Sequence, residues 1–98
     1  MLENLRSEIE LLRRHVAVLR LVKRHEPVGI IKLSELSGIP QHRVRYSLRV
    51  LEQKGIIKPS PQGAVTTRRA EDFLRTLPDE IERLKKELDL CLEQQIGG

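Results

Sequence analysis

Apolar side chains recur at alternating steps of three and four along the first 25 residues. The stripe consists of Leu2, Leu5, Ile9, Leu12, Val16 and Leu19. This spacing places them on one face of a helix, as in a heptad repeat. A second apolar set consists of Leu11, Val18, Leu21 and Val22. The pattern predicts one helix over residues 2–25, ended by Pro27. Its second half is expected to enter a core, and its first half to meet a narrower partner, such as another helix.

Two shorter helices are predicted over residues 30–37 and 40–54, with a sharp turn between them. Gly38 takes the left-handed conformation at low cost, and Pro40 suits the first position of a helix, so both residues mark the turn. The inward face of the second helix is predicted to hold Val44, Ser47, Leu48 and Leu51. Its outward face is predicted to hold His42, Arg45, Tyr46 and Arg49. This helix therefore turns its cations and rings away from the core.

Turn residues near position 60 predict a β-hairpin. Short runs at 56–58 and 64–67 suggest two strands, because each combines β-branched residues with flanking turn residues. Residues 59–63, Pro-Ser-Pro-Gln-Gly, suggest a five-residue tip. A helix over residues 68–76 is predicted to follow, burying Ala70, Phe73 and Leu74.

Pro78 is predicted to break that helix and to start a last one over residues 79–95. Three acids would then lie in its first turn, where the helix dipole favours negative charge: Asp79, Glu80 and Glu82. A second heptad stripe consists of Leu77, Ile81, Leu84, Leu88 and Cys91. Because Cys91 falls on this stripe, we interpret it as a small buried residue rather than a redox sensor.

The predicted order is helix, helix, sharp turn, helix, hairpin, helix, helix. Two short helices around a sharp turn, followed by a hairpin, predict a winged helix-turn-helix: mainly α with a small β-hairpin wing. The long N- and C-terminal helices are expected to serve dimerisation. We expect a single domain over residues 1–98, comprising an interface helix (1–26), the helix-turn-helix and wing (27–69), and coiled-coil-like C-terminal helices (70–98).

The distribution of charge adds a candidate partner. Residues 27–69 carry eight basic and two acidic side chains, whereas residues 70–98 carry four basic and eight acidic ones. The net charge of the whole chain is only +4. A basic middle section between less basic ends suggests a polyanionic partner for that section. The alternative is a solvated surface with no charged partner.

The segment LSELSGIPQHRVRYSLRVLEQKGIIKPS, residues 33–60, resembles the recognition segment of winged-helix transcription regulators, small archaeal ones in particular. The overall plan is similar to the MarR-like and ArsR-like families and to archaeal winged-helix proteins dimerised by coiled coils. The resemblance covers about residues 28–68 and implies DNA binding. ArsR-like metal sites need cysteines in the recognition helix, and this chain has none there. No metal site is therefore expected.

A helix fits the major groove of B-DNA, with its N-terminal residues at the base edges. The residues expected at base edges are Gln41, His42, Arg45, Tyr46 and Arg49. Those expected at phosphates or beside the minor groove are Arg43, Lys54, Lys58, Arg68 and Arg69. The hairpin tip is uncharged, so the wing is expected either to contact the DNA backbone through Ser60 or not to touch DNA. The alternative is that the arginines only solvate an amphipathic helix.

The two heptad stripes predict a homodimer, because a chain of 98 residues cannot cover both by itself. The expected interface residues are Leu2, Leu5, Ile9, Leu12, Leu77, Ile81, Leu84, Leu88 and Cys91. Such a dimer would place two recognition helices about one DNA turn apart, roughly 34 Å. The alternative is a monomer in which the first and last helices pair within one chain.

The expected function is sequence-specific binding of double-stranded DNA by a homodimeric transcriptional regulator in the cytoplasm, associated with the nucleoid when bound. Two alternatives stay open: an architectural DNA-binding protein without sequence preference, and a winged helix that binds other proteins. No catalytic motif, glycine-rich phosphate loop or membrane span is recognisable, so we expect no enzymatic activity, no cofactor and no membrane partner. The sequence does not identify a small-molecule effector.

Overall fold

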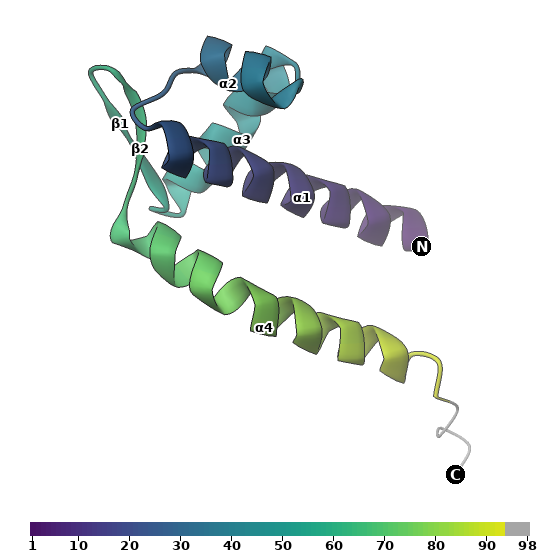
Figure 1. Cartoon of the computed structure of the whole chain (residues 1–98). Coiled ribbons are helices and arrows are strands. Elements are labelled where there is room, and N and C mark those ends of the chain that lie inside the picture. The colour runs from purple at the N-terminus through teal and green to yellow at the C-terminus, as the bar shows by residue number, and fades with distance from the viewer. Residues whose placement is uncertain (94–98) are drawn as a thin grey trace.

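The structure is a computed structural model that describes residues 1–93. Its elements are α1 (Leu2–His25), α2 (Ile30–Ser37), α3 (Gln41–Gln53), β1 (Ile57–Ser60), β2 (Gly63–Thr66) and α4 (Arg68–Leu90) (Figure 1). The described chain is thus mainly helical with a two-stranded antiparallel hairpin, which confirms the predicted fold class. The end of the predicted last helix, residues 94–95, lies outside the described residues.

The core lies where α1, α2 and α3 meet, and the hairpin covers one end of it. It consists of Val18, Leu19, Val22, Val28, Leu33, Val44, Leu51, Ile56, Ile57 and Ala70. The second half of α1 supplies three of these residues, which confirms that this half enters the core. Its first half extends beyond the core, where Leu5 and Ile9 remain 41% and 44% exposed. Apolar burial therefore holds only one end of this long helix.

The turn between α2 and α3 is fixed by local hydrogen bonds. Gly38 has a φ of 74°, and its N–H donates to the carbonyl of Ser34, which ends α2 in a left-handed cap. The Ser34 hydroxyl donates to the carbonyl of Ile39 over 2.6 Å, and the Ser37 hydroxyl accepts from the Ile39 N–H. These bonds fix the direction in which α3 leaves α2.

The hairpin is tighter than the sequence suggested. β1 and β2 pair from Ile57–Thr66 to Ser60–Gly63, so the predicted five-residue tip is wrong and only two residues turn the chain. Proline is tolerated at a sheet edge, and therefore β1 continues through Pro59. Gly63 has a φ of 135°, and a Cβ atom there would lie 2.6 Å from the backbone of Val28. Only glycine allows this close approach.

One continuous helix follows the hairpin, so the predicted break at Pro78 is wrong. The Thr67 hydroxyl caps the helix by accepting from the N–H of Arg69. Proline has no N–H, so the carbonyl of Leu74, four residues earlier, lacks its usual helical hydrogen bond. Because Pro78 is exposed, water can bond this carbonyl instead. The acids predicted for a first turn therefore lie in mid-helix, where the dipole gives them no advantage. Cys91 is exposed just after the end of α4, so its predicted burial on the stripe is also wrong within one chain.

The outer part of α4 extends away from the other elements. Figure 1 shows α1 and α4 leaving the core in the same general direction without packing along each other. Ala70 is buried, and Phe73 and Leu74 pack against the core, whereas Leu84 and Leu88 are 49% and 46% exposed. The described chain is accordingly elongated, with extents of 60 × 27 × 20 Å.

Candidate nucleic-acid interface

Buried residues hold α3 against α1 and α2 and leave its other face to solvent. Val44 and Ser47 are completely buried, and Leu51 is nearly so, as predicted for the inward face. Leu48, predicted inward, is half-buried and packs at the margin of the core. The outward residues His42, Arg45, Tyr46 and Arg49 are all exposed. The predicted division of this helix into two faces is therefore correct.

The exposed face of α3 carries two arginines and a histidine. Within residues 1–93, the side chains of His42, Arg45 and Arg49 make neither a hydrogen bond nor an ion pair. No acidic residue occurs in residues 40–51. The acids nearest in sequence, Glu35 and Glu52, border shallow hollows beside α3. This face therefore offers several guanidinium and ring N–H donors to an external acceptor, such as a phosphate or a base edge.

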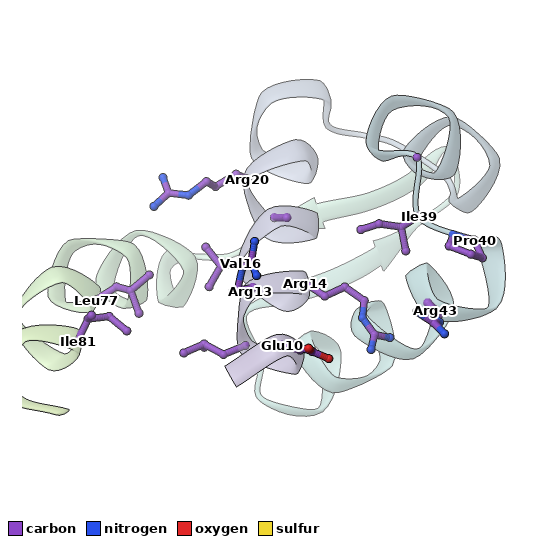
Figure 2. Close-up of a pocket in the computed structure, with 13 residues that line it drawn as sticks. Glu10, Arg13, Arg14, Val16, Arg20, Ile39, Pro40, Arg43, Leu77 and Ile81 are labelled. Carbon is purple, nitrogen blue, oxygen red and sulfur yellow. The ribbon is translucent and has the colours of Figure 1, made fainter. Parts of the chain in front are cut away.

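The other residues predicted to contact DNA are not all in one place. Gln41 lies at the start of α3 beside Arg45, where both line one hollow, and Lys54, Lys58 and Arg68 are exposed. Arg43 lies on another side of α3 and lines a groove with Arg13 and Arg14 of α1 (Figure 2). The sequence could not indicate this position, because it depends on how α1 crosses α3.

Two predicted DNA contacts already have partners within the chain. The Arg69 guanidinium donates to the carbonyl of Lys54 over 3.2 Å, which satisfies an orphan carbonyl at the end of α3. The Ser60 hydroxyl donates to the carbonyl of Gly63 over 2.6 Å and closes the hairpin turn. Both side chains therefore stabilise the fold, and their contact with DNA stays a prediction.

Lys32 is a further candidate that sequence reasoning missed. It is exposed in the first turn of α2 and lines the hollow that also contains Gln41 and Arg45. The first N–H groups of a helix have no partner within it, so this end of α2 attracts anions. The available signal was a lysine placed three residues after Gly29, which precedes the helix.

His15 connects α1 to α3. Its Nδ1 lies 2.8 Å from the Ser47 hydroxyl, and its ring centroid lies 5.9 Å from that of Tyr46. The heptad pattern gave no sign of this position, where the ring is partly buried between the helices. The buried hydroxyl of Ser47 thereby gains its hydrogen-bond partner. His15 thus supports the helix that carries the exposed cations.

Burial, together with the positive charges of Arg14 and Lys54, lowers the pKa of His15 from its usual 6.5, against the opposing effect of Glu8. The folded state therefore favours the neutral ring. The neutral His15 ring therefore contributes to the free energy of unfolding. This contribution is fully present above the pKa that His15 has in the unfolded chain, and it is lost as the pH falls through the lower pKa of His15 in the folded chain. We expect the free energy of unfolding to decline as the pH drops below 6.5, and less steeply in His15→Gln.

Urea unfolding between about pH 7.5 and 5 measures this effect. His25→Gln is the matched control, because His25 is exposed at the end of the same helix. The assignment of this pH dependence to His15 would be contradicted by either of two results. His15→Gln could leave the plot of unfolding free energy against pH unchanged, or His25→Gln could flatten that plot equally.

Two other kinds of site are absent from the described part of the chain. Residues 1–93 contain no cluster of three or more His, Cys, Asp or Glu side chains that could hold a metal ion. None of the helices in this range has an apolar stretch long enough to cross a membrane.

No protein-family model matches the sequence, and no curated protein matches it either. Among solved structures, the chain is similar to the activation domain of the phage T4 transcription factor MotA, with a TM-score of 0.60. The two are 17% identical, and the match covers 78% of this chain and 81% of that chain. At this identity the likeness shows a shared fold.

Proposed function

We propose that the chain binds double-stranded DNA through the exposed face of α3 and does so as a homodimer that regulates transcription. The observation that carries the proposal is that the arginines on this face have no ion-pair partner within residues 1–93. His42, Arg45 and Arg49 are exposed together on a helix whose opposite face is buried. Helices presented in this way fit the major groove, where arginine bonds guanine O6 and N7.

The surrounding charges support the same orientation. Gln41 and Lys32 lie next to Arg45, so base-edge and phosphate contacts would come from neighbouring elements. Lys54 and Lys58 follow at the other end of α3 and on β1, and both are exposed. The acidic C-terminal third lies on α4, which leads away from the core (Figure 1). DNA at α3 would therefore meet basic residues and avoid most of the acidic ones.

Apolar surface that the described chain leaves uncovered supports the proposed homodimer. Leu5, Ile9, Leu84 and Leu88 are between 41% and 49% exposed, all on the two heptad stripes. Since α1 and α4 do not pack along each other, pairing within one chain does not cover these stripes. A second copy would bury them and bring two α3 helices to one DNA duplex.

A role in transcription is supported by analogy alone. The fold is shared with a domain of a transcription factor, and helix-turn-helix plans commonly bind operators. An architectural protein would use the same face without sequence preference. The ratio of specific to non-specific affinity separates the two, because regulators typically reach about 10³ or more.

Fluorescence anisotropy with a random-sequence duplex tests the binding itself. We expect binding that weakens steeply with salt, because each neutralised phosphate releases a counterion. Selection of preferred sequences then measures the specificity ratio. Failure of the protein to bind duplex at low salt would overturn the proposal and favour a role in binding other proteins.

Leu84→Glu is expected to convert the dimer to monomers, because it places a carboxylate on the apolar stripe of α4. Sedimentation velocity measures the change. Lys86→Glu is the matched control, since Lys86 lies on the opposite side of the same helix and is exposed. A Leu84→Glu protein that still sediments as a dimer would show that the interface lies elsewhere.

A further inference from the structure

Within residues 1–93, the outer half of α4 is mostly exposed to solvent. Beyond Leu74, Leu77 and Ile81 are partly buried and line a groove together with residues of α1. Leu84 and Leu88 extend the same stripe into solvent. Isolated helices of this length are marginally stable in water, so most of their stability comes from packing of an apolar face. The stripe therefore needs a cover that lies along the helix.

The groove offers a place for such a cover. It has a volume of about 810 Å³, its floor is α1, and its walls are the α2–α3 turn and α4 (Figure 2). Val16 of α1 and Leu77 and Ile81 of α4 line one side of it. The small residues Ala17 and Gly38 also line it, where another helix can approach closely. The groove is thus apolar in part, elongated along α1, and continuous with the exposed stripes.

The charges beside the apolar stripes of α1 and α4 are opposite in sign. Arg6, Arg13 and Arg20 follow at steps of seven along one edge of the α1 stripe, and the last two line the groove. Glu80 and Glu87 are likewise seven apart beside the α4 stripe. Heptad-spaced flanking charges of opposite sign select partner helices in coiled coils.

These charges do not meet within one chain. In the described residues, every ion pair joins charged groups no more than three positions apart, and none joins α1 to α4. Residues 79–93 carry six acidic and three basic side chains, while the groove is lined by four arginines and one glutamate. A second copy of α4 is therefore an occupant of the right charge and the right apolar pattern.

We propose that α4 of a second copy lies antiparallel to α4 in this groove. The inference rests on the homodimer proposed above and adds its geometry. Leu77, Ile81, Leu84 and Leu88 are spaced by four, three and four residues, a pattern that reads the same in both directions. Antiparallel pairing therefore places Leu77 of one copy against Leu88 of the other, and Ile81 against Leu84. All four residues lie within α4, whereas Cys91 lies beyond its end.

This geometry makes a measurable distinction. In the antiparallel arrangement, equivalent residues lie far apart: the two Leu77 positions are separated by 11 helical steps, roughly 16 Å at 1.5 Å per residue. The two Cys91 residues are farther apart still. A disulfide needs Cα atoms within about 7 Å, so equivalent cysteines cannot join. In a parallel arrangement equivalent positions would be adjacent.

Cysteine cross-linking tests the proposal in the full-length chain. Leu77→Cys and Leu88→Cys are each made in a Cys91→Ser background, so that each protein has one cysteine. The two proteins are oxidised separately and after mixing and re-equilibration, and covalent dimers are measured on non-reducing gels. Sedimentation of each variant establishes that it is still dimeric. Wild type, with only Cys91, is oxidised in parallel.

We expect covalent dimers in the mixture, approaching about half of the chains, and almost none in either protein alone or in wild type. Cross-linking of either single-cysteine protein by itself would overturn the antiparallel arrangement and leave the dimer intact. Dimers that never cross-link, even in the mixture, would also overturn it and place the interface elsewhere. A monomeric wild type would overturn both this inference and the proposed homodimer. Binding of DNA through α3 is tested separately by its arginine variants.

Discussion

Arg45→Ala/Arg49→Ala is expected to lose most of its affinity for DNA. Both guanidinium groups are exposed on α3 and have no partner within residues 1–93. A bidentate arginine–guanine contact contributes about 1–3 kcal/mol, so losing two such contacts would weaken binding to a preferred duplex at least roughly 30-fold. If the arginines contact phosphates instead, the slope of log K against the logarithm of salt concentration should become less steep, by about one for each arginine removed.

Fluorescence anisotropy at several salt concentrations measures both quantities. Arg83→Ala/Lys86→Ala removes the same charge from the exposed outer part of α4 and serves as the control. We expect this control to bind nearly as wild type does. Equal losses in the two double variants would indicate a general charge effect and would remove the support for α3 as the recognition helix.

Patterns within short stretches of sequence predicted most of the fold. The 3-and-4 spacing of apolar residues predicted the observed bounds of α1 and α2. Neither helix contains a Gly or Pro that would interrupt this spacing. Gly38 marked the turn before α3, where the structure places it in the left-handed conformation. The outward cations of α3 followed from the same periodicity. These features depend on residues a few positions apart, and sequence patterns report such relations directly.

The errors occurred where local propensity competes with tertiary context. Pro78 and Pro59 both suggested breaks, yet α4 and β1 continue through them. Pro78 lies on an exposed surface of a helix whose apolar stripe continues on both sides, so the loss of one hydrogen bond does not end the helix. Pro59 lies at a sheet edge, where no ladder bond is lost. Burial and strand pairing therefore decide what a proline does.

The candidate site was predictable in outline but not in its supporting contacts. His15 reaches Ser47 across 32 residues, and Arg69 reaches the carbonyl of Lys54 across 15. Neither contact leaves a periodic signal, because each depends on the angle at which two helices cross. Lys32 was missed for the same reason, since its place beside Arg45 depends on the packing of α2 against α3.

Leu33→Ala is expected to cause a large loss of stability. Leu33 is completely buried in α2, where it packs in the core formed with α1 and α3. Truncation of a buried leucine costs about 2–5 kcal/mol, from lost transfer free energy and the cavity left behind. The free energy of unfolding of domains of this kind is about 5–15 kcal/mol, so the variant would lose a large share of its stability. Because α2 also supports α3, DNA affinity should fall as the folded fraction falls.

Urea unfolding followed by circular dichroism measures the change, at one fixed protein concentration because the stability of the proposed homodimer would depend on that concentration. Leu36→Ala is the matched control, since it makes the same substitution three residues later at a side chain that is 40% exposed. We expect the control to cost far less, because its side chain already contacts water and leaves no closed cavity. Similar losses for the two variants would mean that α2 is not packed through Leu33. That result would also undermine the placement of α3, because the turn at Gly38 sets its direction relative to α2.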